Sequence, residues 1–160
     1  MNAIRRTLVL GTMLAAVVPA ALATAQAGDP VLGTWTLNVA KSKYSLGPAP
    51  KSQTRTYTAT ANGYKFSSKG VDAEGKPTTT EFTTAYDGKF HAVTGSATID
   101  SIMVKRIDAN TTEATQTKAG KLVSKTTRVI SKDGKTLTST ANGKNAAGKA
   151  YTNVEIYDKK

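Results

Sequence analysis

The sequence predicts an all-β protein, an antiparallel up-and-down meander of nine or ten strands that closes most simply into a barrel. Short runs rich in Thr, Val, Ile and Tyr alternate in polarity, as half-buried strands do. Asn62-Gly63, Asp87-Gly88 and Asp133-Gly134 stand between such runs and are strong hairpin signals, because both residues tolerate positive φ. Residues 28–160 show no convincing helical periodicity. Closure is favoured because it leaves no exposed strand edge.

The predicted strands are separated by turn residues and by one longer loop, Ala40–Lys51, which contains Gly47, Pro48 and Pro50. The ten expected strands are Gly33–Val39, Gln53–Thr60, Tyr64–Val71, Pro77–Tyr86, Lys89–Thr94, Thr98–Ile107, Thr111–Lys118, Leu122–Ser131, Lys135–Ala141 and Ala150–Tyr157.

The N-terminus has the order of regions of a secretory signal peptide. Arg5 and Arg6 precede an apolar run over Leu8–Leu22, and Ala25-Gln26-Ala27 supplies a small-x-small cleavage signature. The run of about 15 residues is shorter than the roughly 20 that a membrane-spanning helix needs. We therefore expect a signal peptide over residues 1–27, a periplasmic or secreted location, and one barrel-like domain over residues 28–160 without a transmembrane segment.

Composition predicts a thin, polar interior. Residues 28–160 keep all 11 acidic residues and lose only Arg5 and Arg6 of the 22 basic ones, so their net charge is +9. Val, Leu, Ile and Phe supply only 21 of these 133 residues, whereas Thr is abundant. The interior should therefore be partly lined by Thr, Ser and Tyr, and such an interior is either wet or built to receive a ligand. The absence of cysteine excludes disulfides, thiolate zinc sites and cysteine nucleophiles.

The first strand carries a motif found in calycins. Leu32–Leu37 contains G-x-W and resembles the opening strand of lipocalins and fatty-acid-binding proteins, and Val154–Lys159 looks like the end of a fatty-acid-binding protein. The resemblance implies a calycin-like barrel around a cavity for a small apolar ligand. It also implies that Trp35 seals one end of the barrel, with Arg106 or Arg128 as its partner.

Three features depart from that resemblance. The last strand of fatty-acid binders carries Arg-x-Tyr, and here Glu155-Ile156-Tyr157 keeps the tyrosine but replaces the arginine with an acid. The loop Ala40–Lys51 is too short and proline-rich for the two lid helices of those proteins. The disulfides and C-terminal helix common in lipocalins are missing from the sequence.

A second resemblance covers the opening of the mature chain. Gly33–Tyr44 fits the pattern G-T-W-x-L-N-x-A-K-S-K-[FY], and Gly47–Ser52 continues it. The pattern is similar to that of a group of small secreted bacterial proteins, and this resemblance implies no activity.

Aromatic residues in the predicted strands are the candidate ligand-binding residues. For any single one of them, ordinary core packing is the competing interpretation. The candidates are Trp35, Tyr57, Tyr64, Phe66, Phe82, Tyr86 and Tyr157.

Catalytic and metal chemistry find little support in the sequence. His91 is the only histidine, so both a histidine-rich metal site and an ordinary general base for a nucleophile depend on one residue. The aspartates fall mainly at predicted turns, where backbone geometry accounts for them. We expect a non-enzymatic protein without metal or cofactor.

Two function hypotheses remain. The first is an exported, lipocalin-like protein that binds a small apolar or amphipathic ligand. The second is a basic envelope-associated protein that binds anionic polymers or lipid headgroups through its lysines. Nucleic acid is not expected as a partner, because aromatic residues for base stacking are sparse among the basic segments.

Overall fold

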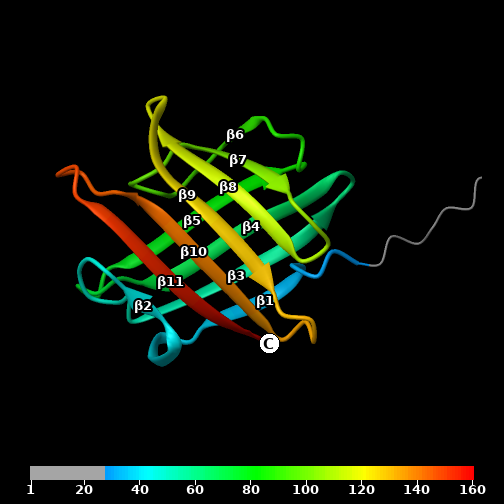
Figure 1. Cartoon of the computed structure of the whole chain (residues 1–160), viewed down its shortest axis with the longest axis horizontal. Coiled ribbons are helices and arrows are strands. Elements are labelled where there is room, and N and C mark those ends of the chain that lie inside the picture. Colours follow the sequence, from blue (N-terminus) through cyan, green and yellow to red (C-terminus); the bar gives the residue numbers. More distant parts are fainter. Residues whose placement is uncertain (1–27) are drawn as a thin grey trace, which may run out of the picture.

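The computed structural model describes residues 28–160, and the predicted signal peptide lies outside the described residues. One antiparallel sheet contains eleven strands in the order β5-β4-β3-β1-β11-β10-β9-β8-β7-β6, with β2 paired to β11 (Figure 1). The elements are β1 (Gly33–Leu37), the 3₁₀ helix η1 (Val39–Lys41), β2 (Lys43–Tyr44), β3 (Ser52–Thr60), β4 (Gly63–Val71), β5 (Pro77–Thr84), β6 (Phe90–Ala92), β7 (Ser101–Arg106), β8 (Thr111–Lys118), β9 (Lys121–Ile130), β10 (Thr136–Lys144) and β11 (Ala150–Lys159).

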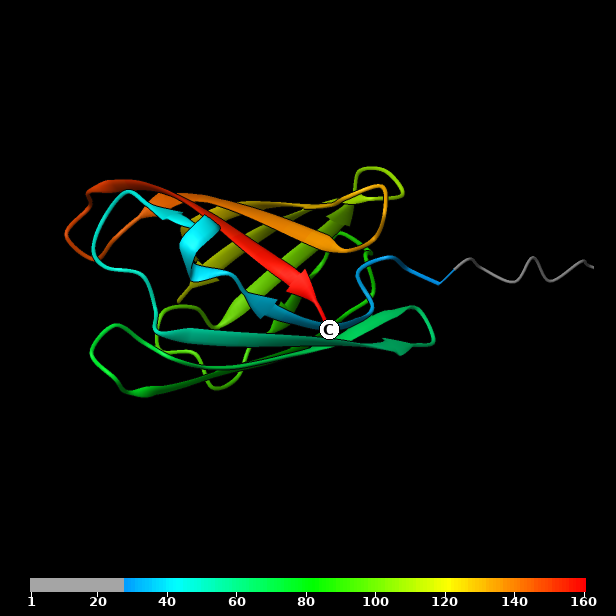
Figure 2. The same ribbon diagram turned by 90° about the horizontal axis from the view of Figure 1, so that it is seen from below.

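The sheet curls until its two ends nearly meet. Glu81 of β5 and Thr94, just after β6, exchange two backbone hydrogen bonds of 2.9 Å across the gap. Figure 2 shows β3, β4 and β5 (teal and green) on one side of the molecule and β10 and β11 (orange and red) on the other. The predicted antiparallel up-and-down meander and its near closure into a barrel are thus confirmed, with β2 as a strand beyond the nine or ten expected.

The extra strand, β2, lies inside the predicted loop. The chain leaves β11 after β1 and then returns to pair with it again as β2. The Asn38 side chain accepts a 3.1 Å hydrogen bond from Lys41 N and so caps η1. The Ser42 hydroxyl accepts a 3.0 Å bond from Ile156 N, in place of a backbone carbonyl. Lys43–Tyr44 then pair with β11. Among residues 28–160, no helix is long and apolar enough to cross a membrane.

Large side chains gather at one end of the barrel, called here the sealed end. Tyr57 packs edge-on against Tyr64 and Phe66, with ring centroids 5.2 and 5.1 Å away. Phe66 stacks on Phe82 at 4.6 Å, and Tyr64 meets Tyr86 at 5.3 Å. These five residues are called the aromatic cluster, and together with fully buried side chains of β1, β10 and β11 they fill this end.

The N-terminal segment completes the seal around Trp35, which is fully buried. The Trp35 indole donates a 2.7 Å hydrogen bond to the Val31 carbonyl. Asp29 pairs with Arg106 and accepts a hydrogen bond from Tyr86, whose ring lies 4.2 Å below the Arg106 guanidinium carbon. The segment before β1 is therefore attached to the far side of the barrel.

The cation that lies on the Trp35 ring is not one of the two arginines expected from the resemblance. Lys159 supplies it, with Nζ 4.9 Å from the ring centroid, rather than Arg106 or Arg128. Arg106 is engaged by Asp29 and Tyr86, and Arg128 faces the cavity described below.

Core packing predicts that replacing two leucines by alanine has very different effects on the free energy of unfolding. Leu137 of β10 is fully buried, whereas Leu122 of β9 is 60% exposed. We expect Leu137→Ala to lower the free energy of unfolding by about 2–5 kcal/mol and Leu122→Ala to change it by less than about 0.5 kcal/mol. Urea unfolding followed by tryptophan fluorescence checks this. Equal losses in the two variants would contradict the burial of Leu137 and the exposure of Leu122.

Candidate ligand-binding cavity

The end of the barrel opposite Trp35 contains a cavity of about 920 Å³ and is called here the open end. Its surface is mainly apolar, and it lies between the inner faces of β3–β5 and β8–β11. The lining residues are Gln53, Arg55, Phe66, Ser68, Thr80, Phe82, Ser96, Ala97, Thr98, Ile99, Gln116, Lys118, Ala119, Lys121, Leu122, Val123, Ser124, Arg128, Lys144, Asn145, Ala146 and Tyr151.

The cavity exists because the inward positions toward the open end carry small or polar side chains. On β4 the inward residue after Phe66, toward the open end, is Ser68, and on β9 the buried residue nearest the rim is Ser124. The Ser124 hydroxyl donates to the Gln116 side chain across the β8–β9 ladder. At Gly143, a Cβ would come within 2.8 Å of the Tyr151 hydroxyl, so glycine there lets Tyr151 lie across β10.

The predicted ligand-binding residues divide into two groups. Phe66 and Phe82 line the cavity. Trp35, Tyr57, Tyr64 and Tyr86 pack toward the sealed end. Tyr157 is also buried, and its hydroxyl donates a hydrogen bond to the cavity-lining Gln53. Their part in ligand binding stays a prediction, while their packing role is visible in the contacts.

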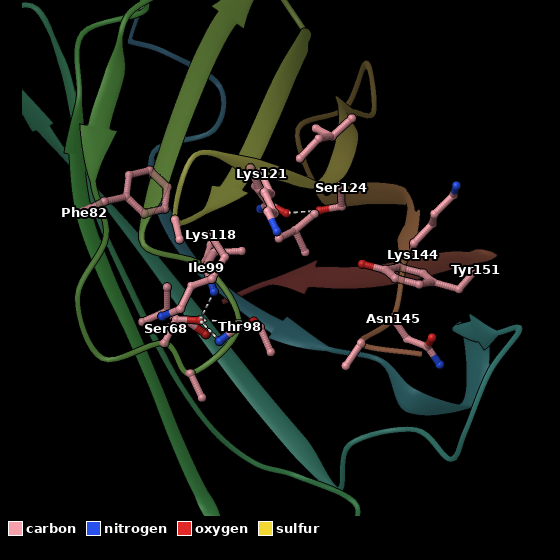
Figure 3. A pocket seen from close by; sticks show the side chains of 18 of the residues that line it. Ser68, Phe82, Thr98, Ile99, Lys118, Lys121, Ser124, Lys144, Asn145 and Tyr151 are labelled. Carbon is pink, nitrogen blue, oxygen red and sulfur yellow. Dashed lines mark hydrogen bonds between the residues drawn. The ribbon is translucent and has the colours of Figure 1, made fainter. Parts of the chain in front are cut away.

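Figure 3 shows how the cavity wall is arranged around its mouth. Phe82 and Ile99 lie on one side, and Lys144 and Tyr151 lie on the other. Lys118 and Lys121 flank the tight β8–β9 turn between them. The walls are therefore apolar and the rim is cationic.

One interior arginine, Arg55, has a complete set of partners. Its guanidinium lies 2.6 Å from a Glu155 carboxylate oxygen and 4.1 Å above the Tyr157 ring. Glu155 also accepts hydrogen bonds from the hydroxyls of Tyr44, at 3.2 Å, and Tyr157, at 3.0 Å. The charge of Arg55 is therefore neutralised within the barrel wall. Glu155 on β11 thus serves a structural ion pair.

The second interior arginine, Arg128, is buried without such partners. It is 5% exposed and lies on β9 between two buried hydroxyl residues, Thr112 and Ser139, on the neighbouring strands. Within residues 28–160, its Nε and Nη1 atoms are buried and have no hydrogen-bond partner. A buried guanidinium normally pairs with an anion, because leaving it unpaired costs several kcal/mol. Arg128 lines the cavity, so an anion held in the cavity can reach it.

Interior tyrosines remain protonated near neutral pH. Burial raises the pKa of Tyr64, and the nearby Arg128 charge lowers it only in part. Burial also raises the pKa of Tyr157 well above its ordinary value. The Tyr157 hydroxyl is therefore a hydrogen-bond donor, and it donates to Gln53 and Glu155.

His91 lies away from this cavity. Its Nε2 is 2.9 Å from an Asp87 carboxylate oxygen on the connection between β5 and β6. Within the part of the chain that the structure describes, no three His, Asp or Glu side chains gather as metal ligands. The histidine therefore forms a surface pair.

Comparison with known proteins gives a likeness to a solved structure. No protein-family model matches the chain, and no curated protein matches it. Among solved structures, zebrafish ileal bile acid-binding protein complexed with cholic acid is similar with a TM-score of 0.45 and 11% identity, over 82% of this chain and 99% of that chain. None of these comparisons identifies a ligand for this chain.

The buried tyrosines predict a loss of stability in alkali. Because folding raises the pKa of Tyr64 and Tyr157 above the ordinary tyrosine value of about 10, their contribution to stability is present below about pH 10 and is lost as pH rises further. Each should cost about 1.4 kcal/mol per pH unit above that point. Urea unfolding midpoints measured between about pH 8 and pH 11 give the slope.

Tyrosine-to-phenylalanine substitutions distinguish a buried tyrosine from a half-buried one in the alkaline unfolding measurement. Tyr64→Phe should flatten the alkaline slope, because it removes one buried ionisable group. Tyr151→Phe, at the half-buried rim tyrosine, is the matched control. A slope that is unchanged in Tyr64→Phe would contradict the assignment.

Proposed function

We propose that this protein is an exported, non-enzymatic binding protein that holds one small amphipathic anion in the open end of its barrel. The observation that carries the proposal is the cavity of about 920 Å³ with the unpartnered Arg128 in its wall. Its volume lies within the roughly 300–1,000 Å³ typical of small-molecule sites. Apolar walls with few polar groups are also typical of such sites.

The cavity chemistry favours a ligand with an acidic head and an apolar body. A carboxylate, sulfate or phosphate ester at Arg128 satisfies the buried guanidinium and forms charge-assisted hydrogen bonds with it. The apolar body then contacts Phe66, Phe82, Ile99 and Val123, which line the same cavity. Arg55 does not compete for the anion, because Glu155 already neutralises it.

Binding without catalysis is supported by what the cavity wall lacks and where the ionisable groups lie. His91 is paired with Asp87 and is not among the lining residues. The lining contains hydroxyl residues, such as Ser68 and Ser124, but no carboxylate or imidazole to activate them. The raised pKa values of Tyr64 and Tyr157 also keep their hydroxyls protonated near neutral pH, so neither is available as a base.

Export is supported by the position of the predicted cleavage site. Gly28, the first residue after it, is exposed, and Asp29 is the first residue bound to the barrel. Cleavage after Ala27 therefore removes none of the contacts that seal the barrel.

Arg128 predicts a ligand-binding defect coupled to a gain in stability. Dodecanoate should raise the unfolding midpoint of the wild-type protein by mass action, and dodecanol, of equal chain length, should raise it less. Arg128→Met should weaken dodecanoate binding at least about tenfold and should stabilise the free protein, because it removes an unpartnered buried cation. Calorimetry and thermal unfolding measure the two effects.

Lys125→Met is the matched control for that variant, because Lys125 lies on the same strand but is exposed on the outer face. It should leave dodecanoate affinity within about twofold of wild type. Equal loss in both variants, or undiminished binding by Arg128→Met, would refute the assignment of Arg128. A broad panel of amphipathic anions without any shift of the midpoint would refute the binding function itself.

A further inference from the structure

The two ends of the barrel differ in surface charge. The exposed lysines at the open end are Lys51, Lys76, Lys118, Lys121, Lys144 and Lys149. The ion pairs found within residues 28–160 use none of them.

Few carboxylates face those lysines. Asp72, Glu74 and Asp100 are the acids on the open-end connections. Asp72 accepts a 2.7 Å hydrogen bond from Lys76 N, and Asp100 accepts one of 2.7 Å from Ala119 N. These three carboxylates offset only half of the charge of the six lysines. The sealed end is different, because its connections carry aspartates and basic residues together. The net positive field is therefore concentrated around the cavity mouth.

An exposed leucine stands among these lysines. Leu122 is 60% exposed and directly follows the β8–β9 turn, with Lys118 and Lys121 on either side of that turn. Ala119 and Gly120 have φ values of 49° and 74°, as a tight two-residue hairpin turn requires. The bond from Ala119 N to Asp100 holds the turn against the neighbouring loop. The hairpin thus presents an apolar side chain between two cations.

We propose that the open end docks on an anionic lipid bilayer, with Leu122 at the boundary of headgroups and acyl chains and Lys118, Lys121 and Lys144 on the lipid phosphates. The lysines alone fit any polyanion. Leu122 favours the bilayer, because only an apolar phase takes up its exposed surface. This docking goes beyond the proposed ligand-binding function and does not depend on whether the cavity is occupied.

Vesicle binding tests the proposal with the purified protein. Vesicles of phosphatidylcholine with phosphatidylglycerol should capture the wild type in flotation, and pure phosphatidylcholine vesicles should not. Replacing Lys118, Lys121 and Lys144 together by Gln should weaken capture about 100-fold, since each lysine near an anionic surface contributes about fivefold. Absence of capture by the anionic vesicles would overturn the proposal.

The control removes the same charge from the other end. Lys132, Lys135 and Lys160 are exposed at the sealed end. A nine-residue strand such as β3 is about 30 Å long, roughly three Debye lengths at 0.1 M salt. Replacing these three by Gln should therefore change capture by less than about threefold. Equal weakening by both triple variants would show attraction by net charge alone and would overturn the docking orientation.

Leu122→Ala separates a bilayer from a soluble polyanion. It should weaken vesicle capture about tenfold, because apolar surface no longer leaves water, and leave binding to polyphosphate unchanged. An unchanged vesicle affinity would overturn the bilayer as the partner. Since Leu122 is exposed, this variant keeps the fold, and its unfolding midpoint verifies that.

Discussion

The barrel has more room inside than its inward-facing side chains can fill, and the rest of the structure depends on that shortage. Strand alternation assigns every second residue to the interior, but few of these residues are large and apolar. Most of the large inward side chains, the aromatic cluster and Trp35, lie toward one end of the barrel, where ring centroids are about 5–6 Å apart. Toward the other end the inward residues are Ser68, Ser124 and Gln116. Closure without filling produces the cavity.

The two interior arginines show how such an interior accommodates charge. Arg55 forms an ion pair with Glu155 and stacks on the Tyr157 ring. These contacts replace the hydration that the guanidinium loses inside the barrel. Arg128 has buried nitrogens without a partner in residues 28–160. A group of this kind weakens the free protein and strengthens a complex with an anion. Stability and binding are therefore opposed at Arg128, and that opposition distinguishes a binding residue from a structural one.

The sequence predicted the barrel because its signals are local. The positive φ at Gly88 and Gly134 matches the turn dipeptides, and alternation placed all ten expected strands. β2 escaped prediction because it is two residues long and exists only through pairing with distant β11. Arg128 was expected only as a partner of Trp35, and its place on the cavity wall was missed because the inward face of β9, with Ser124 and Thr126, has the polarity of an outward face. The aromatic residues were found, but local pattern does not tell which end of a barrel a strand residue reaches.

Sealing one end also determines how a ligand exchanges. The contacts of Asp29 with Arg106 and of Trp35 with Val31 bind the N-terminal segment across the sealed end. Exchange through that end would break a buried core, so a ligand passes the open end instead. Within the described residues the open end has no helical lid, since η1 is the only helix there. The proposed anionic ligand would meet the rim lysines first and then Arg128, so the positive charge at the mouth and the buried cation would attract it in the same direction.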